Sequence, residues 1–353
     1  MSEQATPTKK ILRETFPLGS QWPTIDPFLF LAHHRDTYPA GRDDFGPNAP
    51  LDGRDLGADF ADKDGWNMYH GLVVPGFPQH PHRGFETITY VRRGVIDHAD
   101  SLGAAARYGN GDTQWMTAGS GIVHSEMFPL TDREAPNPAE LFQIWLNLPA
   151  ADKMADPAFK MFWADQTPVI ETVDERGRHV SITIIAGALD DARPVSPPSD
   201  SWASKPESEV AIWHARLEPG ATWTMPATRL GATDRVLYLF EGDHVLMGDE
   251  RLEGGHGALV ESDQAIAVAA GDSTAEILVL QGRPIAEPIA RYGPFVMNDQ
   301  AEVQKAFDDY QTTGFGGWPW PNSGPVHDDA DPFARHPNGE TTRPATNSAP
   351  NGV

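Results

Sequence analysis

Two short stretches of this chain each place two metal-competent side chains two residues apart. They are His80-Pro81-His82 and His124-Ser125-Glu126. In an extended strand, side chains at positions i and i+2 point to the same face of the sheet. Each stretch therefore offers two ligands in one direction. A fold that sets the two strands side by side can surround one metal ion with three imidazoles and one carboxylate.

A second carboxylate competes for the same site. Glu86 follows His82 by four residues, and this even spacing also favours the face of a strand that carries the histidines. On spacing alone, Glu86 and Glu126 are nearly equal candidates for the fourth ligand. Pro81 removes a backbone donor, which suits the edge of a sheet or the entry from a loop into a strand.

The composition narrows the chemistry and the compartment. The chain contains no cysteine, which excludes disulfides, thiolate zinc sites and thiol catalysis. Its formal net charge of -23 leaves no basic patch for direct nucleic-acid binding and opposes docking on anionic membranes. Residues 1–13 are polar and lack the apolar core of a signal peptide, and no apolar run approaches the length of a membrane span. We therefore expect a cytoplasmic protein.

The pattern of short strand-like runs predicts an all-β protein with few short helices. The 353 residues include 33 Gly and 32 Pro, which favour strands and turns over long helices. Two strand-rich blocks of similar length and texture indicate two jelly-roll β-barrels in tandem. The expected parts are a flexible N-terminus (1–20), a metal-binding barrel (21–150), a connector (151–178), a metal-free barrel (179–290), a closing segment with a helix (291–316) and a disordered tail (317–353).

Four segments together resemble the signature of the pirin family, within the cupin superfamily. They are residues 78–87 (PQHPHRGFET), 114–127 (QWMTAGSGIVHSEM), 143–148 (QIWLNL) and 292–298 (YGPFVMN). The resemblance implies a bicupin with one metal ion, normally iron, in the N-terminal barrel. It places the ligands on His80, His82, His124 and Glu126, and it leaves Glu86 beside the ligands or in the pocket.

The chain departs from that family pattern in three places. It has an acidic insertion before Trp66, an extended C-terminal tail and a weakly matching second barrel. Residues 225–229 (MPATR) correspond in position to the first histidine pair and contain no histidine. We assign no metal role to seven other histidines: His33, His34, His70, His98, His214, His244 and His256.

The resemblance also implies quercetinase-like (quercetin 2,3-dioxygenase) activity. The ligand set suits Fe²⁺, and it also accepts Mn, Ni, Cu or Zn. In this interpretation a flavonol such as quercetin chelates the metal through a hydroxyl and the adjacent ketone, and O₂ opens its central ring. Glu126, or Glu86, takes the substrate proton as general base. The expected pocket residues are Phe85, Trp115 and Met116.

Two other roles remain open at this stage. Proteins similar to this one include redox-sensing partners of transcription factors or metabolic enzymes, in which the oxidation state of the iron alters a surface. The acidic chain would then favour a basic protein partner. A purely structural metal, which would only stabilise the barrel, is the least favoured alternative, because the chain has enough apolar strands to form a core without it.

Overall fold

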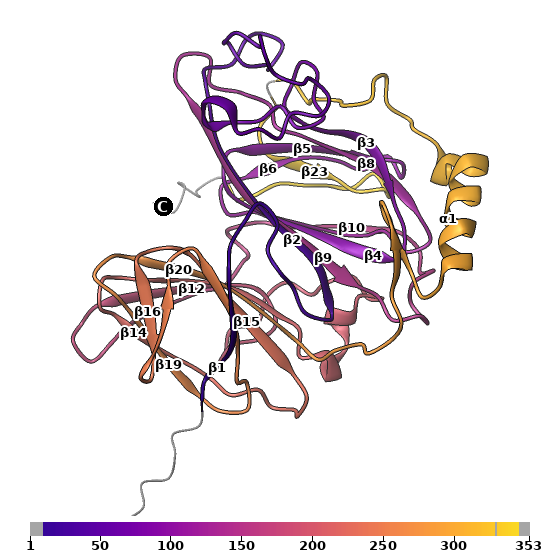
Figure 1. Cartoon of the computed structure of the whole chain (residues 1–353). Helices are drawn as coiled ribbons and strands as arrows, with labels where there is room; N and C mark the ends of the chain where they lie inside the picture. Colours follow the sequence, from indigo (N-terminus) through magenta and orange to yellow (C-terminus); the bar gives the residue numbers. More distant parts are fainter. Residues whose placement is uncertain (1–9, 329, 346–353) are drawn as a thin grey trace, which may run out of the picture. The chain divides into compact units, whose positions relative to one another are not determined.

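The computed structural model describes residues 10–328 and 330–345, and this part of the chain is dominated by β-strands (Figure 1). Helix α1 (Gln300–Thr313) is the one α-helix of the described residues. It is too short and too polar to cross a membrane. Short 3-10 turns occupy Lys63–Gly65, Trp202–Ser204, Pro206–Ser208 and Gly314–Gly316. The predicted all-β class is confirmed.

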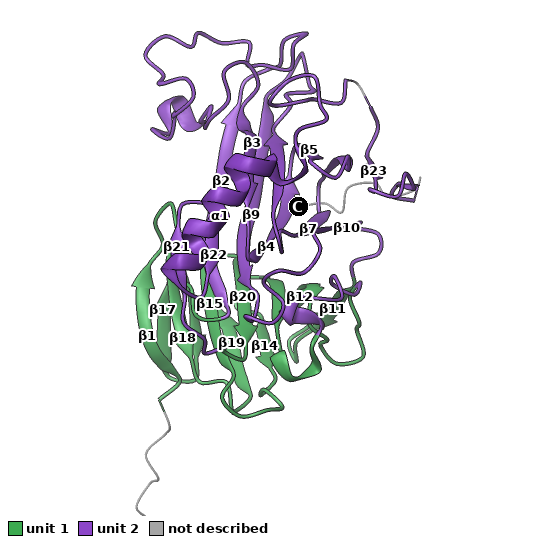
Figure 2. Cartoon of the chain, turned by 90° about the vertical axis from the view of Figure 1, so that its right-hand side faces the viewer, with its two compact units in different colours: residues 1–26, 168–194, 205–284 green, residues 27–167, 195–204, 285–353 purple. Residues whose placement is uncertain are grey.

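The chain divides into two compact units, and each is built from segments that are distant in the sequence (Figure 2). Unit 1 takes the chain up to residue 26, then residues 168–194 and 205–284. Unit 2 takes residues 27–167, 195–204 and the chain from residue 285 onward. Both histidine pairs of the sequence therefore lie in unit 2.

Unit 2 contains two antiparallel sheets and a hairpin. Its five-stranded sheet has the order β10 (Ala158–Phe162), β7 (Thr113–Thr117), β4 (Phe85–Arg93), β9 (Asn137–Asn147), β2 (Phe28–Tyr38). Its six-stranded sheet has the order β24 (Thr341–Thr342), β23 (Phe333–Arg335), β6 (Ala105–Gly109), β5 (Val95–Asp100), β8 (Ile122–Met127), β3 (Gly76–His82). The hairpin pairs β21 (Ala290–Tyr292) with β22 (Phe295–Met297). Apolar side chains from both sheets, such as Val91 and Ile96, share one buried core.

Unit 1 also packs two antiparallel sheets around one core. The seven-stranded sheet has the order β1 (Leu12–Pro17), β18 (His256–Val260), β15 (Asp234–Glu241), β20 (Ala275–Gly282), β13 (Ala211–Leu217), β12 (His179–Ala186), β11 (Val169–Val173). The four-stranded sheet has the order β14 (Thr222–Met225), β19 (Ile266–Ala270), β16 (His244–Met247), β17 (Glu250–Glu253). The core between them is apolar and includes Met225, Leu237 and Val268.

The two units repeat one strand order. The run β7-β4-β9-β2 of unit 2 matches β18-β15-β20-β13 of unit 1, and β6-β5-β8-β3 matches β17-β16-β19-β14. In both runs, the strands follow one another along the chain in the same sequence. This correspondence confirms the duplicated barrel that the two strand-rich blocks predict, and it makes β3 and β14, like β8 and β19, equivalent strands.

Both ends of the described chain join sheets, where the sequence predicts a flexible N-terminus and a disordered tail. Strand β1 pairs with β18, with Leu12 opposite Val260, and β23 pairs with β6, with Ala334 opposite Ala106. Each adds a strand to an edge whose backbone groups would otherwise lack partners. The polar composition of these segments does not predict this order, because the pairing uses main-chain atoms. The outer parts of both predicted segments, residues 1–9 and 346–353, lie outside the described residues.

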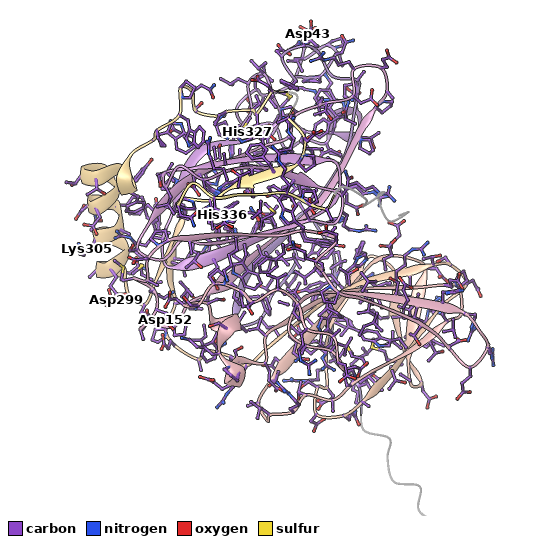
Figure 3. All side chains as sticks on the ribbon, turned by 180° about the vertical axis from the view of Figure 1, so that it is seen from behind. Asp43, Asp152, Asp299, Lys305, His327 and His336 are labelled. Carbon is purple, nitrogen blue, oxygen red and sulfur yellow. The ribbon has the colours of Figure 1, made fainter. Side chains whose placement is uncertain are left out.

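Helix α1 connects the closing segment to the turn between β3 and β4. The Asp299 side chain caps the helix by accepting a hydrogen bond from the Glu302 amide. The Glu302 carboxylate accepts one from the amide of Asn298, the residue before the cap. Asp299 and Lys305 are labelled along the helix in Figure 3. Asp309 of the same helix binds the Arg83 guanidinium at 2.8 Å. The helix therefore braces the turn that directly follows the first histidine pair.

Candidate metal centre

Three of the predicted ligands come together on two adjacent strands. β3 and β8 run antiparallel, with His80 directly opposite His124. The ring centroids lie 4.4 Å apart for His80 and His124, 4.9 Å for His82 and His124, and 4.8 Å for His80 and His82. One ring nitrogen from each of the three residues lies within 4.8 Å of the others. The i and i+2 spacing of the first pair thus puts both imidazoles on the face of the sheet that His124 shares.

The imidazoles are in the state that a metal ion needs. His82 and His124 are buried, and desolvation holds the pKa of both well below the ordinary value. Burial also lowers the pKa of His80 to about 4. All three rings are therefore neutral at pH 7 and carry a free lone pair.

The hydrogen bonding of these rings also fits a metal ion. Nδ1 of His80 lies 2.8 Å from the Pro78 carbonyl, so it carries the proton and leaves Nε2 as the free lone pair. Among the described residues, Nδ1 of His82 and both ring nitrogens of His124 are buried without a hydrogen-bond partner. Buried polar atoms normally have a partner. A divalent first-row metal bound by the three imidazoles would supply one.

The carboxyl group of Glu126 forms hydrogen bonds beside this cluster. The Thr89 hydroxyl lies 2.8 Å from its Oε1 and 2.7 Å from Oε1 of Gln143, and Gln143 Nε2 donates to its Oε2 at 2.7 Å. The hydroxyl donates one hydrogen, and the amide donates only through its nitrogen. A proton taken up by Glu126 would supply the hydrogen for the third contact of this ring. Burial raises the pKa of Glu126.

Glu86 lies away from the histidines. Its carboxylate accepts hydrogen bonds from Trp115 Nε1 at 3.0 Å, Thr117 Oγ1 at 2.8 Å and Ser201 Oγ at 2.5 Å. Burial raises its pKa to about 7. The even spacing from His82 does not hold, because β3 ends at His82 and β4 begins at Phe85 after a turn at Gly84, whose φ is +86°. Alternation counted along one strand does not cross such a turn.

The structure places two of the three predicted pocket residues near the histidines and the third on the other face of the sheet. Phe85 lies next to the cluster, with its ring 5.1 Å from that of His82. Met116 is opposite Thr87 in the sheet and packs with Ile122, the residue opposite His82. The side chain of Trp115 points to the other face of the sheet, where it binds Glu86. The structure therefore does not bring Trp115 to the histidines.

Sequence reasoning misses three residues of this site: Thr89, Gln143 and Trp145. The Trp145 ring lies 5.4 Å from His82 and 4.4 Å from Phe85. Thr89 and Gln143 are opposite each other on β4 and β9, and both face Glu126. A glutamine inside a strand as apolar as residues 141–148 is a usable signal for Gln143, because a buried amide needs a partner.

Comparisons with known proteins agree with this architecture. A family model described as Pirin matches residues 10–146, and one described as Pirin C-terminal cupin domain matches residues 212–316. A Pseudomonas aeruginosa protein provisionally named quercetin 2,3-dioxygenase is 36% identical over 240 residues, which is 67% of this chain and 79% of that protein. Human pirin is 31% identical over 256 residues, 71% of this chain and 81% of that protein.

A solved structure extends the likeness to the whole fold. The crystal structure of quercetin 2,3-dioxygenase from Acinetobacter baumannii matches with a TM-score of 0.68 and 26% sequence identity. The match covers 87% of this chain and 98% of the other. Both units therefore have counterparts in that protein.

Proposed function

The chain belongs to the pirin family, and from this premise we propose that it is a metal-dependent dioxygenase that acts on a flavonol-type chelating substrate such as quercetin. The observation that carries the proposal is the cluster of His80, His82 and His124, which are neutral and have unused lone pairs. Such a cluster fixes one face of a metal ion and leaves the opposite face for a ligand.

The proposed metal is Fe²⁺, held by the three histidines with Glu126 as the carboxylate of the site. When bound, the ion supplies a Lewis acid for the chelated oxygens and the redox chemistry that O₂ requires. His80 is partly exposed, whereas His82 and His124 are buried. A substrate therefore approaches from the side of His80.

Glu126 is the proposed proton acceptor. Its raised pKa means that the ionised carboxylate binds a proton strongly, so it can take the proton that the substrate hydroxyl loses on chelation. Thr89 and Gln143 then hold the protonated carboxyl through the ring of contacts described above. Glu86 is not proposed for this role, because both its oxygens are bound by Trp115, Thr117 and Ser201.

Aromatic and apolar side chains supply the walls of the site. Phe85 and Trp145 stand against His82, and Met116 packs on Ile122 nearby. Flat apolar walls favour a planar substrate over a flexible polar one and keep bulk water from the reacting atoms.

The test is metal analysis of protein purified without oxygen, followed by oxygen uptake with quercetin. The proposal expects about one iron per chain and rapid uptake that depends on substrate. His124→Ala is the matched control, because it removes a ligand without touching the pocket walls. One iron per chain without quercetin-dependent uptake would overturn the proposal and favour a redox-sensing role with a protein partner.

A further inference from the structure

The acidic insertion carries an exposed aromatic side chain. Phe60 is 55% exposed, in a chain whose net charge is -23. The position of Phe60 relative to His80 suggests a role for this side chain.

A continuous series of ring contacts leads from Phe60 to the metal ligand His80. The Phe60 ring lies 6.4 Å from that of Phe77, and the Phe77 ring lies 6.4 Å from that of His80. Phe77 stacks on Tyr69 at 5.1 Å and meets His34 edge-on at 5.7 Å. Phe77 is thus the centre of an aromatic cluster that is only partly buried and that borders the metal centre.

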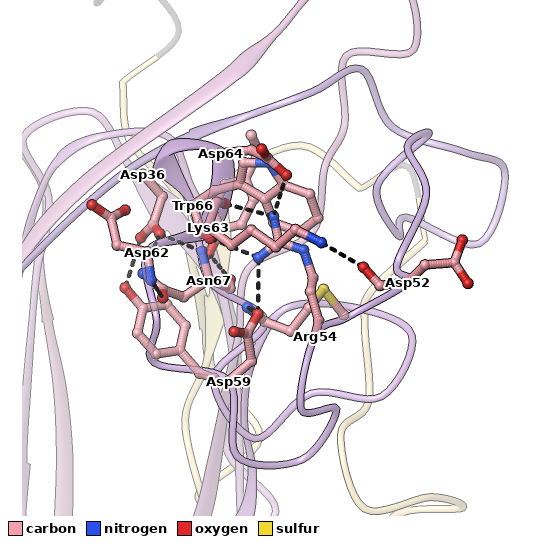
Figure 4. Close-up of polar contacts among 12 residues, drawn as sticks. Asp36, Asp52, Arg54, Asp59, Asp62, Lys63, Asp64, Trp66 and Asn67 are labelled. Atoms are coloured by element: carbon pink, nitrogen blue, oxygen red, sulfur yellow. Dashed lines mark hydrogen bonds and ion pairs between the residues drawn. The ribbon is translucent and has the colours of Figure 1, made fainter.

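The loop that presents Phe60 is held rigidly. Arg54 donates to the Asp59 carboxylate at 3.0 Å and to the Trp66 carbonyl at 2.9 Å, and its guanidinium lies 3.3 Å from the centre of the Trp66 ring (Figure 4). The backbones of Asp59 and Tyr69 exchange two hydrogen bonds of 2.9 Å. These contacts fix the residues on both sides of Phe60. A surface that is ordered before binding loses little entropy when a ligand arrives.

A polar group completes the surface. The His34 ring lies 4.8 Å from Tyr69 and 5.7 Å from Phe77, and it is partly exposed. Burial lowers its pKa to about 4, so the ring is neutral at pH 7 and offers one donor and one acceptor. A neutral imidazole among aromatic rings suits a phenol, whose hydroxyl can both donate and accept.

We propose that Phe60, Phe77 and His34 form an aromatic subsite that binds the phenolic ring of the substrate that does not chelate the metal. The inference rests on the proposed function, since it assumes that a chelating aromatic substrate sits at His80. A flavonol carries such a ring bonded directly to its chelating ring. Continuity with the metal centre favours this occupant over a protein partner.

The test compares two ligands that share one chelating group. Quercetin adds two phenolic rings to this group, one fused to it and one bonded to it, whereas maltol, a small hydroxypyranone, has neither. Dissociation constants are measured by titration of the metal-loaded protein without oxygen. An aromatic pair is worth about 0.5–1.5 kcal/mol, so Phe60→Ala should weaken quercetin binding about two- to twelvefold and leave maltol binding unchanged.

Matched variants make the result specific. Val173→Ala removes a similarly exposed apolar side chain from unit 1 and should change neither constant. His34→Phe keeps the ring and removes the polar atoms, so it should weaken quercetin alone. Unchanged quercetin binding in Phe60→Ala, equal weakening of both ligands, or wild-type protein that prefers maltol would each overturn the subsite. Quercetin that binds through Phe60 without oxygen uptake would instead overturn the dioxygenase proposal and leave the subsite standing.

Discussion

Strands β3 and β8 of unit 2 and strands β14 and β19 of unit 1 hold the same place in sheets of the same order, but their inward side chains differ. Unit 2 places His80 opposite His124, whereas unit 1 places Trp223 opposite Val268; in both units the first residue lies two positions before the end of its strand. In unit 1 these positions belong to one apolar core. The barrel can therefore close around apolar side chains at the positions where unit 2 carries histidines, which separates the histidines from any requirement of the fold.

Buried polar atoms without a hydrogen-bond partner are also distributed unequally between the two units. Of the 13 buried side-chain nitrogen and oxygen atoms that have no hydrogen-bond partner among the described residues, 12 belong to unit 2 and one, in Arg235, to unit 1. Each such atom costs about 1–3 kcal/mol of stability. A protein keeps such a cost where function requires it. Three of the 12 atoms are ring nitrogens of His82 and His124, so part of this contrast lies at the histidine cluster.

The largest effect is expected when His124, the residue that most clearly distinguishes the two barrels, is replaced. His124→Ala should abolish stoichiometric metal binding, since this ring lies within 5 Å of both other imidazoles and bridges the two strands. The variant should stay folded, as unit 1 does without a histidine at this place. Metal content by elemental analysis and far-UV circular dichroism provide the two measurements. Full metal retention would contradict the ligand assignment.

A second difference between the two barrels concerns a charged residue near the start of two equivalent strands. The second residue of β4 is Glu86 and that of β15 is Arg235, and both are buried. Burial raises the pKa of Glu86 to about 7 and lowers that of Arg235 to about 10. Only the carboxyl therefore changes its charge near neutral pH.

The sign of the resulting pH dependence follows from the shift of Glu86. From pH 4.5, the ordinary pKa, up to about 7, the unfolded state releases the proton while the folded state keeps it. Rising pH therefore lowers the free energy of unfolding, by roughly 3 kcal/mol over this window. In denaturant titrations over this window, Glu86→Gln should lose less stability than wild-type protein, by about this amount. Arg235→Gln serves as the control and should keep the slope; an equal slope in Glu86→Gln would contradict the assignment.

Much of the fold could be predicted from local patterns, and what could not depends on distant pairing. The strand periodicity and the i, i+2 histidines need only neighbouring residues, so the two barrels and the three-histidine cluster follow from the sequence. The turn at Gly84 reverses the chain between His82 and Glu86, and a count of residues cannot detect it. Thr89 and Gln143 face Glu126 only because β4, β9 and β8 meet in space.

The ends of the chain show the same limit. The segments that form β1 and β23 carry few apolar residues, and their order depends on edges supplied by β18 and β6. His327, which is labelled in Figure 3, illustrates the point. Its ring forms a hydrogen bond of 2.8 Å with the carbonyl of His98, more than two hundred residues away in the sequence. Composition predicts disorder for such a segment because composition does not describe the edge that receives it.

The smallest effect is expected when each barrel receives, at one position, the type of residue that the other barrel carries. Met225→His should destabilise unit 1 by about 1–3 kcal/mol, because it buries an imidazole among apolar side chains that offer it no partner. His124→Leu should raise the free energy of unfolding of metal-free protein by a similar amount, since it removes two unpartnered nitrogens at nearly constant volume. Both are measured by denaturant titration with a chelator present, because bound metal stabilises only protein that retains its ligands. If His124→Leu destabilises the metal-free protein as much as Met225→His does, then the histidine is part of the packing of unit 2, and the separation of site from fold is wrong.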